Sequence, residues 1–241
     1  MIKIETDSNT ATEAEKYIIG TGFYSSGEFD DSFFSIWYKN TYKYANPEEV
    51  VVVNSNCKKP EGAKGTWINL NRNPQHVRDM RDQSISFGGW SISFIASATV
   101  ALANNVDFIY KEQDCLAFGN WVHEIYRQAK EENLKMLVGV KNNPQKVEQS
   151  LIYVRKDFVQ RFLSELYGID RSDINMRPEY KFLSIMERFP DSTGFLKIGT
   201  GCNRPFDVNK ETFYIQRPGI PNDLPRIPDY ELQLLKSKGL I

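Results

Sequence analysis

The chain has 241 residues, of which 41% are hydrophobic and 13% aromatic, enough to form a sizeable core in one large domain or two small ones. Its 30 basic and 31 acidic residues give a net charge of −1, which argues against a nucleic-acid-binding protein because such a protein needs a basic surface. The sequence shows no run of about 18 apolar residues and no N-terminal signal peptide, so we expect a soluble protein located in the cytoplasm.

The hydrophobic pattern predicts an alternation of short strands and helices. A first strand at Tyr17–Gly22 leads to an amphipathic helix at Phe33–Tyr42, which stops near Pro47. Val50–Val53 is an unbroken β-branched run, typical of a strand that is covered on both faces in a parallel sheet. The next predicted elements are a strand at Trp67–Leu70, a small-residue helix at Ser91–Asn104 and a strand at Asp107–Tyr110.

The second half of the chain continues this alternation. Its predicted elements are a helix at Gly119–Asn133, strands at Lys135–Val140 and Ser150–Val154, and helices at Phe158–Leu166 and Pro178–Arg188. The tail from Pro218 is rich in proline, and we expect it to lie extended over the surface. The order of elements predicts one α/β domain with a mostly parallel sheet flanked by helices.

Two acidic residues follow the strand at Asp107–Tyr110. Glu112 and Asp114 are separated only by Gln113, and a turn beyond the strand can aim both carboxylates at one ligand. Carboxylate oxygens suit Mg²⁺ or Mn²⁺. In an open α/β sheet, ligands bind in the crevice outside the carboxyl ends of the strands. This motif therefore favours a divalent metal and a phosphate-bearing substrate.

The order of these motifs resembles the GT-A family of nucleotide-sugar-dependent glycosyltransferases over roughly residues 17 to 190. In that family a nucleoside-binding strand, a second strand with a polar end and an alanine-rich helix precede a strand that carries an Asp-any-Asp motif. The counterparts here are Ile18–Tyr24, Val50–Ser55, Ser91–Asn104 and Glu112–Asp114. Downstream, the segments at 150–158 and 177–182 are similar to the acceptor-site strand and to the helix start that carries the base in inverting members.

The resemblance implies a single GT-A-like domain over residues 1–241, with a core at about 17–217 and the proline-rich tail at 218–241. Its substrates would be a UDP- or GDP-linked sugar donor and a hydroxyl acceptor, most simply a glycan. Glu112 and Asp114 would hold Mn²⁺ or Mg²⁺. Glu179 would be the general base of an inverting reaction, although capping of its own helix is an equal use for this carboxylate.

The remaining candidates would bind the donor. A nucleoside pocket would use the glycine-rich strand end and an aromatic ring, and a planar guanidinium suits diphosphate oxygens. Several of these side chains have an equally good structural use, in turns, in loop capping or in the core. The donor-binding candidates are Thr21, Tyr24, Asn54, Trp90, Gln113 and Arg204.

Two alternatives stay open at this point. Glu112 stands where the family has Asp, and no histidine near the C-terminus completes the metal site, which leaves room for a non-catalytic carbohydrate-binding or assembly protein with the same fold. A sugar nucleotidyltransferase is less favoured because the segment 22–31 contains no Lys or Arg to cradle a triphosphate. The pattern specifies no oligomeric state.

Overall fold

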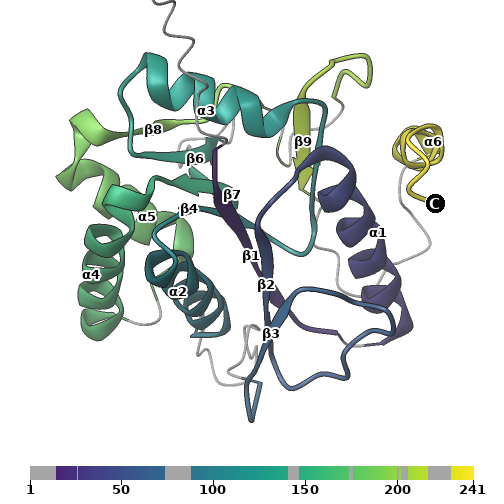
Figure 1. Ribbon diagram of the computed structural model, residues 1–241, viewed down its shortest axis with the longest axis horizontal. Helices are drawn as coiled ribbons and strands as arrows, with labels where there is room; N and C mark the ends of the chain where they lie inside the picture. Colours follow the sequence, from purple (N-terminus) through teal and green to yellow (C-terminus); the bar gives the residue numbers. More distant parts are fainter. Residues whose placement is uncertain are drawn as a thin grey trace, which may run out of the picture.

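A seven-stranded sheet forms the centre of the molecule (Figure 1). The computed structural model describes residues 15–25, 27–73, 88–140, 147–173, 176–199, 201, 206–216 and 229–241. The strand order is β3-β2-β1-β4-β7-β6-β8, and β7 runs antiparallel to both of its neighbours while the other pairs are parallel. The strands are β1 (Tyr17–Phe23), β2 (Glu49–Asn54), β3 (Thr66–Asn69), β4 (Asp107–Lys111), β6 (Met136–Val140), β7 (Val147–Val154) and β8 (Thr193–Phe195). The predicted mostly parallel α/β sheet is confirmed.

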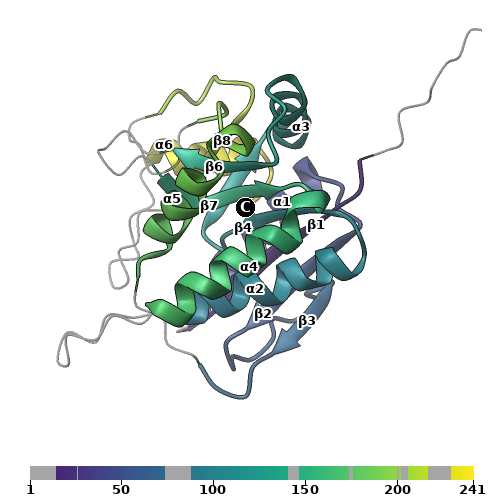
Figure 2. The same cartoon turned by 90° about the vertical axis from the view of Figure 1, so that its left-hand side faces the viewer.

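Helices cover both faces of this sheet. The helices are α1 (Glu28–Tyr44), α2 (Gly88–Ala103), α3 (Trp121–Glu131), α4 (Lys156–Ser172), α5 (Pro178–Arg188) and α6 (Asp229–Ser237), with a 3-10 turn at Pro190–Ser192. The α2, α4 and α5 helices share one apolar cluster with the sheet, whereas α1, α3 and α6 share the other. Figure 2 shows α2 and α4 side by side on their face of the sheet.

Helix α2 packs unusually close to strand β1. A Cβ atom on Gly20 would lie 2.4 Å from Ser97 Oγ, and one on Gly22 would lie 2.6 Å from Ser93 Oγ. Both serine hydroxyls donate hydrogen bonds of 2.7 Å to backbone carbonyls one turn earlier in α2, so they add no unsatisfied polar group to the interface. The two glycines of β1 therefore serve to bring α2 against the strand.

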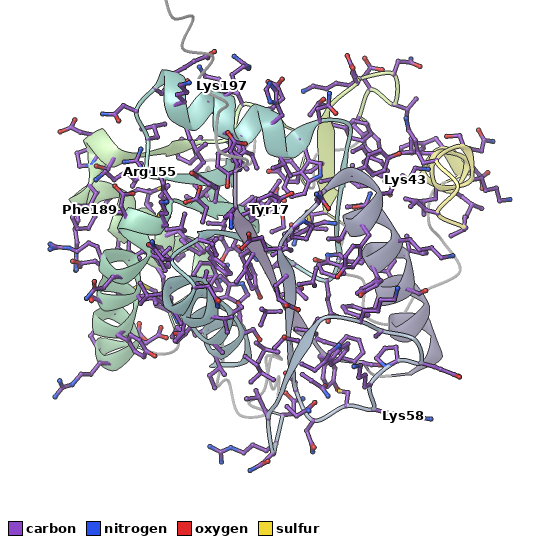
Figure 3. The ribbon with its side chains drawn as sticks, in the orientation of Figure 1. Tyr17, Lys43, Lys58, Arg155, Phe189 and Lys197 are labelled. Carbon is purple, nitrogen blue, oxygen red and sulfur yellow. The ribbon has the colours of Figure 1, made fainter. Side chains whose placement is uncertain are left out.

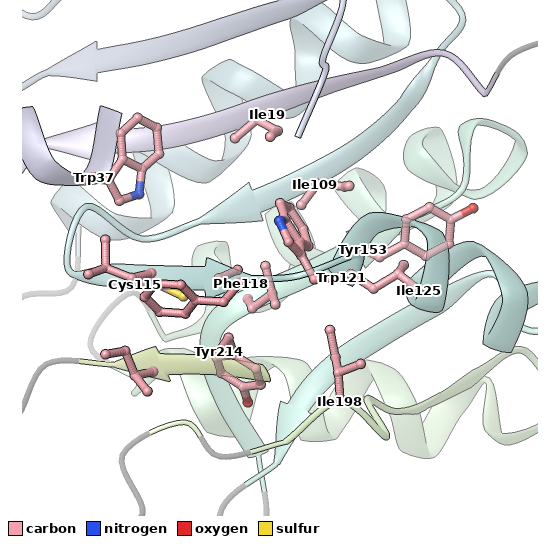
Figure 4. Packing of buried hydrophobic residues seen from close by; sticks show 14 of the residues in the cluster. Ile19, Trp37, Ile109, Cys115, Phe118, Trp121, Ile125, Tyr153, Ile198 and Tyr214 are labelled. Carbon is pink, nitrogen blue, oxygen red and sulfur yellow. The ribbon is translucent and has the colours of Figure 1, made fainter. Parts of the chain in front are cut away.

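The core on the opposite face is rich in aromatic side chains. Figure 4 shows part of it, with Trp37 of α1, Trp121 of α3 and Tyr153 of β7 around the sheet. Phe34 stacks on Trp37 with ring centroids 5.2 Å apart. The aromatic residues of α1 thus belong mainly to the core, although Tyr42 remains 46% exposed.

A second, two-stranded sheet was not predicted from the sequence. It pairs β5 (Cys115–Phe118) with β9 (Phe213–Gln216) in antiparallel register. Its side chains extend the aromatic core, since Phe118 and Phe213 stack with centroids 4.9 Å apart. Strand β5 begins directly after the acidic motif, so this sheet joins the motif to a segment about 100 residues later in the chain.

The end of the C-terminal tail is helical, whereas we predicted an extended tail from Pro218. Residues 218–228 lie outside the described part of the chain, but Asp229–Ser237 form α6, which buries Leu234 and Leu235 in the core beside α1. Lys43 of α1 donates a hydrogen bond to the backbone carbonyl of Lys238 at the end of α6 (Figure 3). Burial of the leucine pair explains why this segment folds as a helix. No helix in the described ranges is long and apolar enough to cross a membrane.

Candidate active site

A pocket of about 270 Å³ lies outside the carboxyl ends of β1 and β4. This is the edge of an α/β sheet where ligands usually bind. Strand β7 also contributes, because it runs antiparallel to β4 and its first residues therefore reach the same edge. The lining residues are Gly22, Phe23, Tyr24, Ser55, Gly89, Trp90, Ser93, Tyr110, Glu112, Gln113, Asp114, Gln149 and Gln216.

Glu112 and Asp114 are brought together in this pocket by the turn between β4 and β5. The backbone N–H of Glu112 donates to the carbonyl of Ser150, and the N–H of Cys115 donates back to the carbonyl of Glu112, both at 2.9 Å. Gln216 of β9 donates from Nε2 to Glu112 Oε2 at 3.0 Å. The acidic turn is thus held by the main sheet on one side and by the small sheet on the other.

Tyr110 lies beneath the two carboxylates. Burial raises the pKa of Tyr110 well above its ordinary value, and the nearby charges of Glu112 and Asp114 raise it further. Its hydroxyl therefore stays protonated and neutral over the physiological pH range. In the pocket it can serve as a hydrogen-bond donor.

Gln113 points away from its two acidic neighbours and pairs with the backbone of Tyr24. Its Nε2 donates to the Tyr24 carbonyl at 3.0 Å, and its Oε1 accepts the Tyr24 N–H at 2.8 Å. The amide of Gln113 therefore connects the acidic turn to the loop after β1. Both residues line the pocket, and the side chain of Gln113 is occupied within the protein.

Two buried polar atoms of the pocket walls have no hydrogen-bond partner among the described residues. They are Trp90 Nε1, a donor on α2, and Gln149 Oε1, an acceptor on β7. Buried polar groups are normally paired, and each such exception needs an explanation. A hydroxyl group both donates and accepts, so a ligand hydroxyl that reached either atom would be able to pair with it.

Lys111 ends β4 on the side opposite to the pocket. It is fully buried beneath α1, where its Nζ donates to Asn40 Oδ1 at 2.7 Å and to Thr41 Oγ1 at 2.8 Å. The ammonium lies 4.9 Å from the centre of the Trp37 ring. Burial lowers the pKa of Lys111 to about 7. These contacts fix the strand end from which the acidic turn departs.

Three predicted site residues of the described ranges, Thr21, Asn54 and Glu179, do not line this pocket. Thr21 is fully buried, and its hydroxyl donates to the neighbouring Gly22 carbonyl at 3.3 Å. Asn54 closes the turn after β2, since its Nδ2 donates to the Cys57 carbonyl at 2.7 Å. Glu179 is partly exposed in the first turn of α5, and Arg204 lies outside the described residues.

Several pocket residues escaped the sequence analysis. Gln149 and Gln216 come from β7 and β9, whose positions at this edge depend on antiparallel pairings that a single sequence does not show. Ser93 and Tyr110 lie in elements that were predicted, but both looked like ordinary packing residues. The one available hint was that Gln149 directly precedes the acceptor-like segment at 150–158.

No protein-family model and no curated protein matches the chain. Among solved structures it is similar to a glycosyltransferase involved in the glycosylation of the major capsid of PBCV-1, with 10% identity and a TM-score of 0.52 over 83% of this chain and 93% of that chain. It is also similar to the galactosyltransferase LgtC in complex with donor and acceptor sugar analogues, with 9% identity and a TM-score of 0.55 over 93% of this chain and 94% of that chain. At such identities the similarity establishes the fold. Together with the strand order and the antiparallel β7, it shows that the protein has the GT-A fold.

Proposed function

We propose that the protein is a glycosyltransferase that moves a sugar from a UDP- or GDP-linked donor to a hydroxyl group of a glycan acceptor. One observation carries this proposal. Two carboxylates, Glu112 and Asp114, share a pocket with the unpartnered polar atoms of Trp90 and Gln149. The pocket thus combines a place for a cation and phosphate with a place for sugar hydroxyls.

The diphosphate of the donor would lie between the acidic turn and the first turn of α2. Gly89 of that turn lines the pocket, and the turn contains no acidic residue, so its backbone N–H groups and the helix dipole favour an anion. A divalent cation held by Glu112 and Asp114 would attract the diphosphate to the acidic turn.

The side chains present are compatible with Mg²⁺ or Mn²⁺. Within the described ranges no group of three or more His, Cys, Asp or Glu side chains could hold a metal, but Mg²⁺ is commonly bound by one or two carboxylates together with substrate phosphate and water. Glu112 and Asp114 would be those two ligands, and Gln216 would orient Glu112 through its hydrogen bond. When bound, the metal would stabilise the charge that develops on the leaving diphosphate.

The donor sugar would lie against Trp90 and Gln149. The indole N–H would donate to one hydroxyl, and the Gln149 carbonyl oxygen would accept from another. Tyr110, kept protonated by burial, adds a further donor to the pocket.

For the acceptor we propose Glu179 as the general base, which would take the proton of the attacking hydroxyl and give inversion at the anomeric carbon. The resemblance to inverting family members supports this role. The packing of its helix supports it too, because Phe182 of α5 meets Trp90 edge to face with ring centroids 5.2 Å apart. Glu179 therefore begins a helix that is packed against the pocket wall.

Donor hydrolysis tests the proposal directly. A panel of UDP- and GDP-sugars would be incubated with the wild type in Mg²⁺ or Mn²⁺, and release of the nucleoside diphosphate would be followed. We expect one donor to be hydrolysed and Asp114→Asn to remove that activity, while Glu131→Gln on the exposed face of α3 leaves it unchanged.

The opposite result is equally informative. If no donor is hydrolysed and calorimetry with UDP and GDP in Mn²⁺ shows no binding, the proposal fails. The fold would then serve a non-catalytic carbohydrate-binding or assembly protein.

A further inference from the structure

A buried ion pair joins three helices behind the candidate active site. Lys181 of α5 has no exposed surface, and its Nζ lies 2.6 Å from Asp170 Oδ1 of α4. The same ammonium donates to Ser91 Oγ of α2 at 3.0 Å, and Ser91 Oγ donates to Asp170 Oδ1 at 3.4 Å. The three side chains form a closed triangle between α2, α4 and α5.

A gain in the free energy of folding is a poor explanation for this buried ion pair. Removing an ammonium and a carboxylate from water costs more free energy than their attraction commonly returns, and an apolar replacement of both is often neutral or better. Helices α4 and α5 are also joined by a second ion pair, between Arg188 and Glu165 at 2.6 Å. Its arginine is 55% exposed, so less free energy is needed to remove its charge from water. Unlike the exposed Arg188–Glu165 pair, the buried Lys181–Asp170 pair also forms hydrogen bonds with Ser91 in a third helix, α2.

The triangle of Lys181, Asp170 and Ser91 lies close in sequence to two parts of the candidate site. Ser91 directly follows Gly89 and Trp90, the residues of the first turn of α2 that line the pocket. Lys181 comes two residues after Glu179, in the first turns of α5. Neither Lys181 nor Ser91 lines the pocket. The triangle therefore links the donor-binding wall to the start of the helix that carries the proposed base.

We propose that Lys181 is a positioning residue that holds the first turn of α2, and with it the indole of Trp90, in place relative to the start of α5. Its charge is held by Asp170, and its hydrogen bond to Ser91 fixes α2 along the helix axis. Phe182, the next residue in α5, packs edge to face against the Trp90 ring and so adds an apolar contact between α2 and α5. The effect of this positioning on donor use rests on the proposed function.

The first test asks whether Trp90 moves, and it requires no substrate. The protein contains four tryptophans, so 5-fluorotryptophan labelling gives few resonances, and Trp90→Phe identifies the one from Trp90. We expect Ser91→Ala and Lys181→Met to shift that resonance. Arg188→Met is the matched control, because it also breaks an ion pair between α4 and α5 and lies at the far end of α5.

The second test measures donor use. We expect Ser91→Ala and Lys181→Met to raise KM for the donor about tenfold with a smaller change in kcat, since a displaced Trp90 weakens donor binding before it alters the chemical step. Arg188→Met should stay within about twofold of the wild type. Ser91→Ala removes one hydroxyl and leaves the ion pair, so it keeps the test valid if Lys181→Met fails to fold.

The two tests separate the two proposals. A wild type that accepts no nucleotide-sugar refutes the proposed function, while a selective shift of the Trp90 resonance would still support the positioning role. If Ser91→Ala and Lys181→Met move the Trp90 resonance no more than Arg188→Met does, the positioning role is wrong.

Discussion

The side-chain amide of Gln113 pairs with the backbone of Tyr24 through two hydrogen bonds, from Nε2 to the carbonyl at 3.0 Å and from the N–H to Oε1 at 2.8 Å. The residue between two acidic side chains thus ties the turn after β4 to the loop after β1, across 89 positions of sequence. In the proposed enzyme, this pairing sets the distance between the acidic end of the pocket and the loop that would face the nucleoside.

Removing this pairing should weaken donor binding as well as stability. We expect Gln113→Ala to cost about 1–2 kcal/mol of unfolding free energy, because two net hydrogen bonds are lost, and to weaken donor affinity about tenfold as the two loops separate. Gln113→Glu keeps the acceptor but places a carboxylate oxygen against the Tyr24 carbonyl and a third negative charge beside Glu112 and Asp114, so it should be no more stable than Gln113→Ala. Urea unfolding and calorimetry with the nucleoside diphosphate measure the two effects. Unchanged affinity in Gln113→Ala would mean that the pairing only stabilises the fold.

The close packing of α2 on the glycines of β1 predicts that larger residues at these positions destabilise the protein. Gly20→Ala should destabilise the protein by about 1–3 kcal/mol, because its Cβ would lie 2.4 Å from Ser97 Oγ and 2.7 Å from the ring of Phe108. Gly22→Ala meets only Ser93 closely, so its cost should be smaller, and Ser93→Ala in the same chain should recover part of it. Thermal unfolding of the three variants and the wild type checks this order. An equal cost at both positions would contradict it.

Glu179 offers a test of the reaction type. If it is the general base, Glu179→Gln should lower transfer to the acceptor by about 100-fold or more and leave the affinity for the donor nearly unchanged, because the amide keeps the shape of the side chain but cannot take a proton. Proton NMR of the first product would show which anomer forms. Retention of configuration, or full activity of Glu179→Gln, would leave this carboxylate with a structural role in the first turn of α5.

The ion pairs of Asp157 predict that part of the stability of the protein depends on pH. The hydrogen bond from Arg155 and the nearby Lys135 lower the pKa of this carboxyl to about 2. Because the pKa is lower in the folded than in the unfolded chain, the stabilisation is complete above the unfolded value and is lost as pH falls through the folded one. Its side chain is 47% exposed, so the effect should be about 1 kcal/mol or less.

The corresponding variant is Asp157→Asn. It should be less stable than the wild type at neutral pH, and the difference should narrow in urea unfolding as the pH falls from about 5 to about 2. A difference that stays constant over this range would show that the carboxylate charge does not contribute.

Local pattern in the sequence determined much of the fold. The run Val50–Val53 predicted a strand covered on both faces, and the structure places it in β2 between two parallel neighbours. The small residues at Ser91–Asn104 predicted a helix, and in α2 two of them, Ser93 and Ser97, pack closely over the two glycines of β1. The acidic motif was recognised because it directly follows an apolar strand. All of these depend on residues near one another in the chain.

The tertiary structure alone decided which side chains share the pocket. Thr21 lies one position from Gly22, yet strand alternation turns its side chain to the opposite face of the sheet, and the sequence does not say which face meets the ligand. Gln149 and Gln216 reach the pocket only through the antiparallel pairing of β7 with β4 and of β9 with β5. Such pairings join distant segments by backbone hydrogen bonds, which nearly every residue type can form. The hydrophobic period of the sequence therefore predicted the strands and helices, but it could not predict which strands lie side by side.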